Sequence, residues 1–330
     1  MHIKVMNNDA SIFHRYYHPE AFKDRFIDDR TDALDILIPI IHTNEMWESN
    51  LRSIYREVPV HRLLIGNGGC IDNSIEIVKK YPRVTIFDHA KYKTLGFSIR
   101  KLIEEVSTEW FAYFHSDVFL PHGWFETMKK YKKEYDWYGC QMQITALVEF
   151  PDENNATKNR PFAGTQIGRK KAFTPHLHEI DDDFVYRQED YVFNNVVEKG
   201  GFKTGFVDDV FHYHQLIHKK SPWSRNIKRV TVEMDWSPEE LARASDMQVH
   251  GVVKYLKPTN YLASWISLDL ARLIELKKLS WKEFKNWAEE VNPQWKPYLK
   301  YWQVFLMRMY LNLSRGEGIL QKCKRWFLKK

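Results

Sequence analysis

The sequence predicts an α/β fold in which a mostly parallel central sheet is flanked by helices and followed by a helical C-terminal region. Three observations lead to this prediction. Short apolar segments alternate with amphipathic helical segments between residues 35 and 118. Hydrophobic residues make up 44% of the 330 residues, which is enough material for a large core. Beyond residue 221 the chain shows helical spacing and many aromatic residues.

The first half of the chain repeats a strand–helix unit. The expected strands are residues 35–40, 61–66, 84–88 and 110–117. Pro39 lies near the end of the first strand, where a missing N–H donor is tolerated. Between the strands, apolar residues recur at three- and four-residue spacing over residues 47–58, 75–81 and 95–106, which is the period of an amphipathic helix. We expect Thr43 or Asn44 to cap the first helix. This alternation predicts right-handed βαβ units and a parallel sheet.

After the fourth strand the pattern is less regular. Residues 124–135 carry another apolar helical face, whereas residues 152–160 are polar and are expected to form a loop. A second α/β section is expected at residues 161–218, and helical spacing returns at residues 261–278, 281–291 and 302–312. We therefore expect three parts, namely an N-terminal extension (residues 1–32), an α/β domain (residues 33–220) and a helical region (residues 221–330).

Composition narrows the function classes. The net charge of +6, from 49 basic and 43 acidic residues, is compatible with an anionic substrate, a phospholipid surface or nucleic acid. Nucleic-acid binding would need a larger basic surplus on one face, so we expect none. The cysteines, Cys70, Cys140 and Cys323, form no C-x-x-C pair, which argues against a disulfide framework and indicates a reducing, cytoplasmic compartment. We find no apolar signal segment in residues 1–30 and no apolar stretch of 18 residues.

The most informative segment is the fourth strand, an aromatic run that ends in His115, Ser116 and Asp117. Open α/β sheets bind ligands at the carboxyl ends of their strands, so Asp117 is a candidate for ligand chemistry. A structural alternative is that Asp117 caps the turn that contains Pro121 and Gly123.

Two common nucleotide fingerprints are absent from the sequence. The loop that begins at Gly66 has Ile71 where the last glycine of G-x-G-x-x-G belongs, and no G-x-x-x-x-G-K-[ST] motif occurs. These departures count against a dinucleotide-dependent dehydrogenase and a P-loop enzyme.

A different set of motifs follows the predicted sheet. In order, they are Ile36-Leu-Ile-Pro39, Leu64-Ile-Gly-Asn-Gly-Gly-Cys-Ile-Asp72-Asn-Ser74, Phe114-His-Ser-Asp117, Gln188-Glu-Asp190 and His212-Tyr-His214. Their order and spacing over residues 33–218 resemble the family 2 glycosyltransferases of GT-A fold. The resemblance implies a hexosyltransferase-like enzyme that moves a sugar from a nucleotide-diphosphate donor to an acceptor hydroxyl. It also implies inversion at the anomeric centre and a glycan or lipid-linked acceptor.

The resemblance implies a role for individual residues. Asp190 is expected to be the general base, with Glu189 orienting the acceptor, and Asp117 and His214 are expected to bind Mn²⁺ or Mg²⁺. The donor-binding residues implied are Pro39, Asn67, Asp72, Lys91, His115, Ser116, Asp117 and Arg169. Two departures from the family pattern stand out. Gly66 replaces the first acid of the loop after the second strand, and His115 replaces the first Asp of the D-x-D motif.

Several alternatives remain open at this point. Glu189 and Asp190 can serve only to stabilise a helix N-terminus, and His214 can be a packed histidine. The fold can belong to a catalytically inactive carbohydrate-binding or scaffold protein, or to a sugar nucleotidyltransferase. The basic, aromatic segment at residues 322–330 fits either peripheral contact with the cytoplasmic face of a membrane or a solvated chain end.

Overall fold

The computed structural model describes residues 32–41, 43, 45–70, 72–92, 94–145, 151, 156–160, 164–180, 189–215 and 238–314. Its described part divides into two compact units, residues 32–215 and residues 238–314, and each is treated by itself. The N-terminal extension up to residue 31, Gln188 and the basic segment at residues 322–330 lie outside the described residues. The expected boundary at residue 220 lies there too, so the division into three parts stays a prediction.

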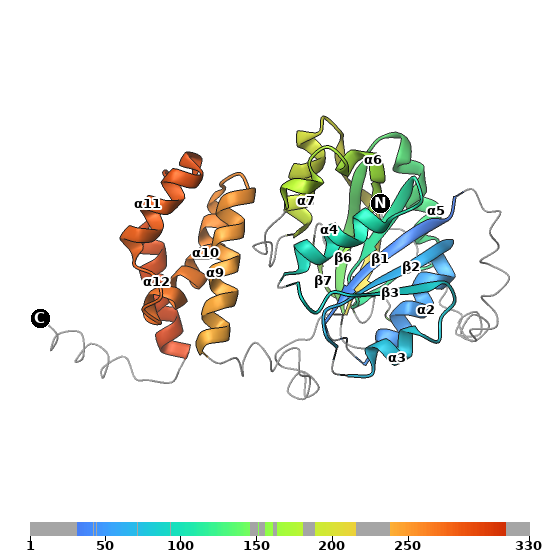
Figure 1. The fold of residues 1–330 in the computed structure, drawn as a ribbon, viewed down its shortest axis with the longest axis horizontal. Helices are drawn as coiled ribbons and strands as arrows, with labels where there is room; N and C mark the ends of the chain where they lie inside the picture. The colour runs from blue at the N-terminus through green and yellow to red at the C-terminus, as the bar shows by residue number, and fades with distance from the viewer. Residues whose placement is uncertain are drawn as a thin grey trace, which may run out of the picture. The chain divides into compact units, whose positions relative to one another are not determined.

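The first unit is built on one mixed sheet (Figure 1). Its strands are β1 (Leu34–Ile40), β2 (Val60–Asn67), β3 (Val84–Asp88), β4 (Trp110–Phe114), β5 (Val118–Phe119), β6 (Trp137–Thr145), β7 (Ala156–Arg160), β8 (Thr165–Arg169) and β9 (Thr204–His214). The order across the sheet is β3-β2-β1-β4-β8-β6-β9-β5, with β7 paired to β6. Strands β3, β2, β1 and β4 are parallel, and β8 runs antiparallel to both β4 and β6. The predicted fold class is therefore confirmed.

Helices cover both faces of this sheet. They are α2 (Trp47–Glu57), α3 (Ser74–Val78), α4 (Leu95–Glu105), α5 (Trp124–Met128), α6 (Lys170–Phe173) and α7 (Glu189–Lys199), with 3₁₀ turns at Lys129–Lys133 and Leu177–Glu179. Helices α2 and α3 pack on one face and α4 on the other (Figure 1). Strand β1 is buried along both faces because helices cover it on each side, which explains its continuous apolar run.

Three local expectations were wrong. The fourth strand ends at Phe114, and Val118–Phe119 forms a separate strand that pairs with β9. Residues 156–160 form β7 on the edge of β6, since pairing to β6 supplies the hydrogen bonds that the polar sequence did not predict. Helix α2 begins after Met46 without a side-chain cap, and the Thr43 hydroxyl instead lies 2.6 Å from that of Ser74.

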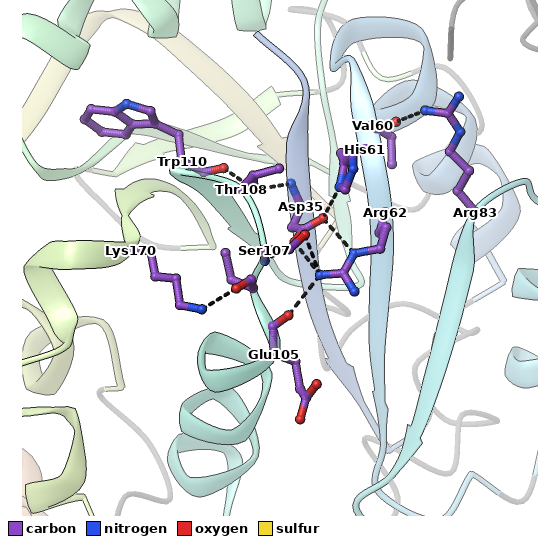
Figure 2. A network of polar contacts seen from close by, with 11 residues as sticks. Asp35, Val60, His61, Arg62, Arg83, Glu105, Ser107, Thr108, Trp110 and Lys170 are labelled. Carbon is purple, nitrogen blue, oxygen red and sulfur yellow. Dashed lines mark hydrogen bonds and ion pairs between the residues drawn. The ribbon is translucent and has the colours of Figure 1, made fainter. Parts of the chain in front are cut away.

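A buried carboxylate ties together the strand ends opposite the carboxyl edge of the sheet (Figure 2). Asp35 of β1 is fully buried and accepts hydrogen bonds from Arg62 Nη2 at 2.6 Å and from the Ser107 amide at 2.6 Å. His61 Nδ1 lies 2.8 Å from its other oxygen. Burial acts to raise the pKa of Asp35, but the hydrogen bonds from Arg62, Ser107 and His61 outweigh it and lower the pKa.

The second unit is helical. Its helices are α9 (Pro238–Tyr255), α10 (Asn260–Glu275), α11 (Trp281–Val291) and α12 (Tyr301–Ser314), with a 3₁₀ turn at Pro293–Trp295. Thr259 caps α10 and Ser280 forms a capping box at the start of α11. The helical region predicted from the sequence is thus confirmed, although α9 had not been recognised. Within the described residues, we find no helix long and apolar enough to cross a membrane.

Candidate active site

Four segments that are distant in the sequence meet at the carboxyl end of β4. The His115 amide donates to the carbonyl of Gly164, just before β8, at 2.9 Å. The Gln215 amide, just after β9, donates to the Asp117 carbonyl at 2.8 Å. Helix α7 begins with Glu189 beside the His115 ring. The ends of β4 and β9 and the starts of β8 and α7 therefore place their polar side chains in one cluster.

One half of the cluster has the donors of a metal site. His115, Asp117 and His214 each offer a ligand atom within 4.8 Å of the others. His214 Nε2 lies 3.1 Å from Asp117 Oδ1, and both side chains are buried. A carboxylate beside imidazole nitrogen suits Mn²⁺ better than Mg²⁺, which prefers oxygen ligands alone. The donor set of Asp117 and His214 therefore fits the expected cation.

His115 has a different role from those two residues. Its Nε2 lies 3.0 Å from Glu189 Oε1. Burial acts to lower the pKa of His115, but the hydrogen bond to Glu189 and the nearby carboxylates outweigh it and raise the pKa to about 9. An imidazole that carries a proton at neutral pH is a poor metal ligand, so His115 is better described as the counter-charge of Glu189.

The acid pair forms the other half of the cluster. Glu189 Oε1 accepts a hydrogen bond from the Tyr113 hydroxyl at 3.2 Å, in addition to its contact with His115. Burial acts to raise the pKa of Glu189, but the hydrogen bond and charge of His115 outweigh it and lower the pKa. Glu189 is therefore an ionised carboxylate whose Oε1 is held in place by two neighbours.

Asp190 has a different environment from Glu189. Its Oδ1 accepts a hydrogen bond from Gln166 Nε2, and Gln166 itself is fully buried. Burial, followed by the neighbouring charge of Glu189, raises the pKa of Asp190 to about 7. A carboxylate that titrates near neutral pH is well matched to accept a proton from a substrate. The two adjacent acids thus have pKa values shifted in opposite directions.

The loop after β2 lies at the same edge of the sheet, because the parallel register pairs Pro39 with Gly66 and Ile40 with Asn67. Asn67 Oδ1 accepts from the amides of Gly69 and Cys70 at 3.0 and 2.9 Å. These hydrogen bonds shape the loop, so the side-chain oxygen of Asn67 has a structural role.

Asp72 also braces this part of the molecule. Its Oδ1 accepts from the Ser74 amide at 3.1 Å and its Oδ2 from the Thr43 amide at 3.3 Å. The carboxylate thus links the loop to the segment that follows β1. Lys91 is exposed after β3, whose carboxyl end shares this edge with Asn67, and its Nζ lies 5.2 Å from the centre of the Tyr92 ring.

The structure does not bring Arg169 to the cluster. Strand β8 runs antiparallel to β4, so Thr165 lies beside Phe114 whereas Arg169 lies beside Trp110 at the other end. The guanidinium of Arg169 pairs there with Glu109 at 2.6 Å. The expectation that Arg169 contacts donor phosphate is therefore corrected. Ser116 does lie within the turn of the cluster, is buried, and accepts from Asn50 Nδ2 through its carbonyl at 3.0 Å.

Sequence reasoning missed two residues that hold the acid pair. Tyr113 lies on β4 two positions before His115, which directly follows the strand, so the alternation of an extended chain favours the same face for both side chains. Gln166 is the partner of Tyr113 across the β4–β8 pair, so only the antiparallel register reveals it. Alternation was a usable signal for Tyr113, whereas nothing local in the sequence identified Gln166.

Comparison with known proteins finds a family model that matches part of the sheet unit. Residues 35–192 match the family model described as Glycosyl transferase family 2. No match was found among the curated proteins. Similar solved structures include the bifunctional IspDF from Campylobacter jejuni, with 11% identity over 53% of this chain and 49% of that chain and a TM-score of 0.38.

Residues 1–349 of S. aureus TarS are also similar. In complex with UDP-GlcNAc, they show 12% identity over 87% of this chain and 93% of that chain, with a TM-score of 0.47. In complex with UDP, they show 13% identity over the same shares, with a TM-score of 0.45. The present chain spans about half the length of IspDF and most of the TarS fragment.

Proposed function

We propose that this chain, in which residues 35–192 form a glycosyl transferase family 2 domain of GT-A type, moves a sugar from a nucleotide-diphosphate donor to an acceptor hydroxyl. The observation that carries the proposal is the cluster at the end of β4. There, a buried acid pair with oppositely shifted pKa values adjoins an aspartate–histidine pair suited to a divalent cation. Transfer of a sugar needs both a base and a charge opposite the leaving diphosphate.

In this proposal Asp190 is the general base. Its Oδ1 is bonded to Gln166, and its other oxygen takes the proton of the acceptor hydroxyl. The acceptor oxygen then bonds to the anomeric carbon while the bond from that carbon to the donor phosphate breaks. The diphosphate leaves with the electron pair. A single displacement of this kind inverts the anomeric centre. Glu189, which is held by Tyr113 and His115, orients the acceptor.

Asp117 and His214 are the residues that would hold Mn²⁺ or Mg²⁺. A bound ion of this kind offsets the negative charge that grows on the leaving diphosphate. Pro39 and Asn67 lie at the carboxyl ends of β1 and β2, and Lys91 follows β3, so we assign the nucleoside end of the donor to these three residues.

A lipid-linked acceptor is supported by α12 of the helical unit. Five of its side chains are 40–57% exposed and lie on one face of the helix. They are Tyr301, Trp302, Phe305, Leu306 and Met309. The chain from residue 300 to its end carries eight basic residues and one acidic residue. An aromatic, apolar helix face that is followed in the sequence by a basic segment fits the interface of an anionic bilayer. Free thiols at Cys70 and Cys140 fit the proposed cytoplasmic side.

The donor can be found with a thermal-shift screen of UDP-, GDP- and dTDP-sugars, with and without Mn²⁺, using a CMP-sugar as the monophosphate comparison. We expect the donor among the UDP-, GDP- and dTDP-sugars. Its binding should raise the melting temperature of the protein, and this rise should depend on Mn²⁺. Asp117→Asn should remove this dependence, and the control Asp246→Asn, which changes a half-exposed acid on α9, should not. Donor affinity that is unchanged in Asp117→Asn would overturn the metal assignment.

Two further measurements test the rest of the proposal. Product analysis by NMR should show an anomeric configuration opposite to that of the donor, and retention would exclude single displacement. Donor binding without transfer to any acceptor would instead favour the non-catalytic scaffold.

For the membrane contact, Trp302→Ser together with Phe305→Ser should reduce sedimentation with vesicles that contain anionic lipid. The control Trp281→Ser changes a partly buried ring. Equal sedimentation of the double variant and the wild type would reject the α12 face as the contact.

A further inference from the structure

A chain of polar contacts continues behind the proposed cation site into the core. We propose that His212 sets the ring orientation and the tautomer of His214, so that His214 presents the lone pair of Nε2 to a divalent cation beside Asp117. His212 is thus a positioning residue that does not touch the cation itself. This inference rests on the proposed function, because it concerns the same cation site.

The contacts run from Asp117 through two histidines of β9 to Thr165 at the start of β8. His214 Nε2 lies 3.1 Å from Asp117 Oδ1, and its Nδ1 lies 3.3 Å from His212 Nε2. His212 Nδ1 in turn lies 2.8 Å from the Thr165 hydroxyl. His212 and Thr165 are essentially fully buried, so water has little access to replace either of them in this chain.

The position of the proton on a neutral imidazole explains how His212 can select one tautomer of His214. A histidine that binds a cation through Nε2 must carry its proton on Nδ1, and that proton needs an acceptor. His212 Nε2 is placed to accept it. His212 then carries its own proton on Nδ1, where the Thr165 hydroxyl oxygen accepts it.

The same contacts also work with every donor reversed. Without a cation, His214 carries its proton on Nε2, the ring nitrogen nearest to Asp117, while His212 Nε2–H donates to His214 Nδ1 and the Thr165 hydroxyl donates to His212 Nδ1. Each imidazole holds one N–H in both arrangements, so cation binding changes the tautomer of both rings without changing their charge.

Packing fixes the ring of His214 as well as its proton. Gly164 has a φ of +90°, and a Cβ at this position would come within 2.8 Å of His214 Cε1. The ring of His115 lies 5.4 Å from that of His214 at a near-perpendicular angle. Because these neighbours enclose the ring, the acceptor at His212 meets Nδ1 in a defined position.

The test is Mn²⁺ binding by the full chain, measured by calorimetry without donor or acceptor. His212→Phe keeps an aromatic ring but offers no acceptor, and should weaken Mn²⁺ binding about 10- to 100-fold. His212→Gln can place an amide oxygen near the position of Nε2, and should recover most of the affinity. The control His89→Phe removes another buried histidine, which bonds Ser98 outside the cluster, and should bind Mn²⁺ like the wild type.

Two additions keep the test decisive. If His212→Phe does not fold, His212→Asn replaces it, because the shorter amide can still meet Thr165 but does not extend to His214. Histidine ¹⁵N NMR of the wild type, with Mg²⁺ as a diamagnetic probe, should show the proton of His214 moving from Nε2 to Nδ1. A loss caused only by altered packing would not produce both this change and the rescue by glutamine.

The outcomes separate this inference from the proposed function. If neither the wild type nor Asp117→Asn binds Mn²⁺, the cation site itself fails, and the inference fails with it. If Asp117→Asn loses binding while the His212 variants keep wild-type affinity, only the role of His212 is overturned. A proton that stays on His214 Nε2 with the cation bound would also overturn it.

Discussion

The pKa of Asp190 predicts how transfer depends on pH. Burial, followed by the charge of Glu189, raises this pKa to about 7, and the proposed base acts only when it is ionised. About half of the Asp190 carboxylate is ionised at pH 7 and about one hundredth at pH 5, so kcat/KM should fall about 50-fold between pH 7 and pH 5. Above pH 8 this group should no longer limit the rate.

Two substitutions identify the group responsible for this acid limb. Asp190→Asn removes the base and should lower kcat about 10²- to 10⁴-fold, with donor affinity close to that of the wild type. Glu189→Gln removes the second cause of the raised pKa, so the acid limb should move to lower pH. Its effect on kcat at pH 8 should be smaller than that of Asp190→Asn.

The assay is the initial rate of transfer from pH 5 to pH 9 at fixed ionic strength, with donor affinity measured separately by calorimetry. Asp246→Asn on α9 is the matched control and should reproduce the wild-type profile. A flat wild-type profile between pH 5 and pH 8 would refute the assignment of Asp190. Loss of activity in Glu189→Gln with full activity in Asp190→Asn would reverse the two roles.

Two further predictions concern stability and the shape of the site. Asp35→Ala leaves Arg62 without its buried partner and should lower the free energy of unfolding by about 3 kcal/mol in urea titrations. Folding lowers the pKa of Asp35, so its contribution to the free energy of unfolding should be complete well above pH 4 and be lost as the pH falls through the folded-state pKa. If Asp35→Ala lost as much stability as the wild type over this pH range, this assignment would be refuted. Gly164→Ala combines a positive φ with a clash against His214, so it should lower the free energy of unfolding by about 1–3 kcal/mol and weaken Mn²⁺ binding. Unchanged Mn²⁺ affinity in calorimetry would contradict the clash.

Sequence periodicity predicted the parallel half of the sheet because its units are local. Each strand from β1 to β4 is followed or preceded by a helix whose apolar face is visible in a short window. The sequence also predicted Asp117, Glu189, Asp190 and His214 as candidate site residues. They lie at the ends or starts of regular elements, and the structure places all four around His115.

The antiparallel half could not be predicted in the same way. Residues 156–160 read as a polar loop, and their strand exists only because β6 offers an edge to pair with. Arg169 shows the same limit. Its distance from the cluster follows from the direction of β8 against β4, and direction is a property of long-range pairing rather than of the local sequence.

The environment of the acid pair favours an enzyme over a binding scaffold. Glu189 and Asp190 are both buried, and only Glu189 is bonded to a positively charged neighbour, since Asp190 is bonded to the neutral amide of Gln166. Folding raises the pKa of Asp190, so its carboxyl ionises near pH 4 in the unfolded chain and near pH 7 in the folded chain. The free energy of unfolding therefore falls as the pH rises from about 4 to about 7. Asparagine at this position would keep an oxygen for Gln166 and avoid this cost. A protein that only binds a sugar gains nothing from such a carboxylate, whereas a transferase gains a base that titrates at the pH where it works.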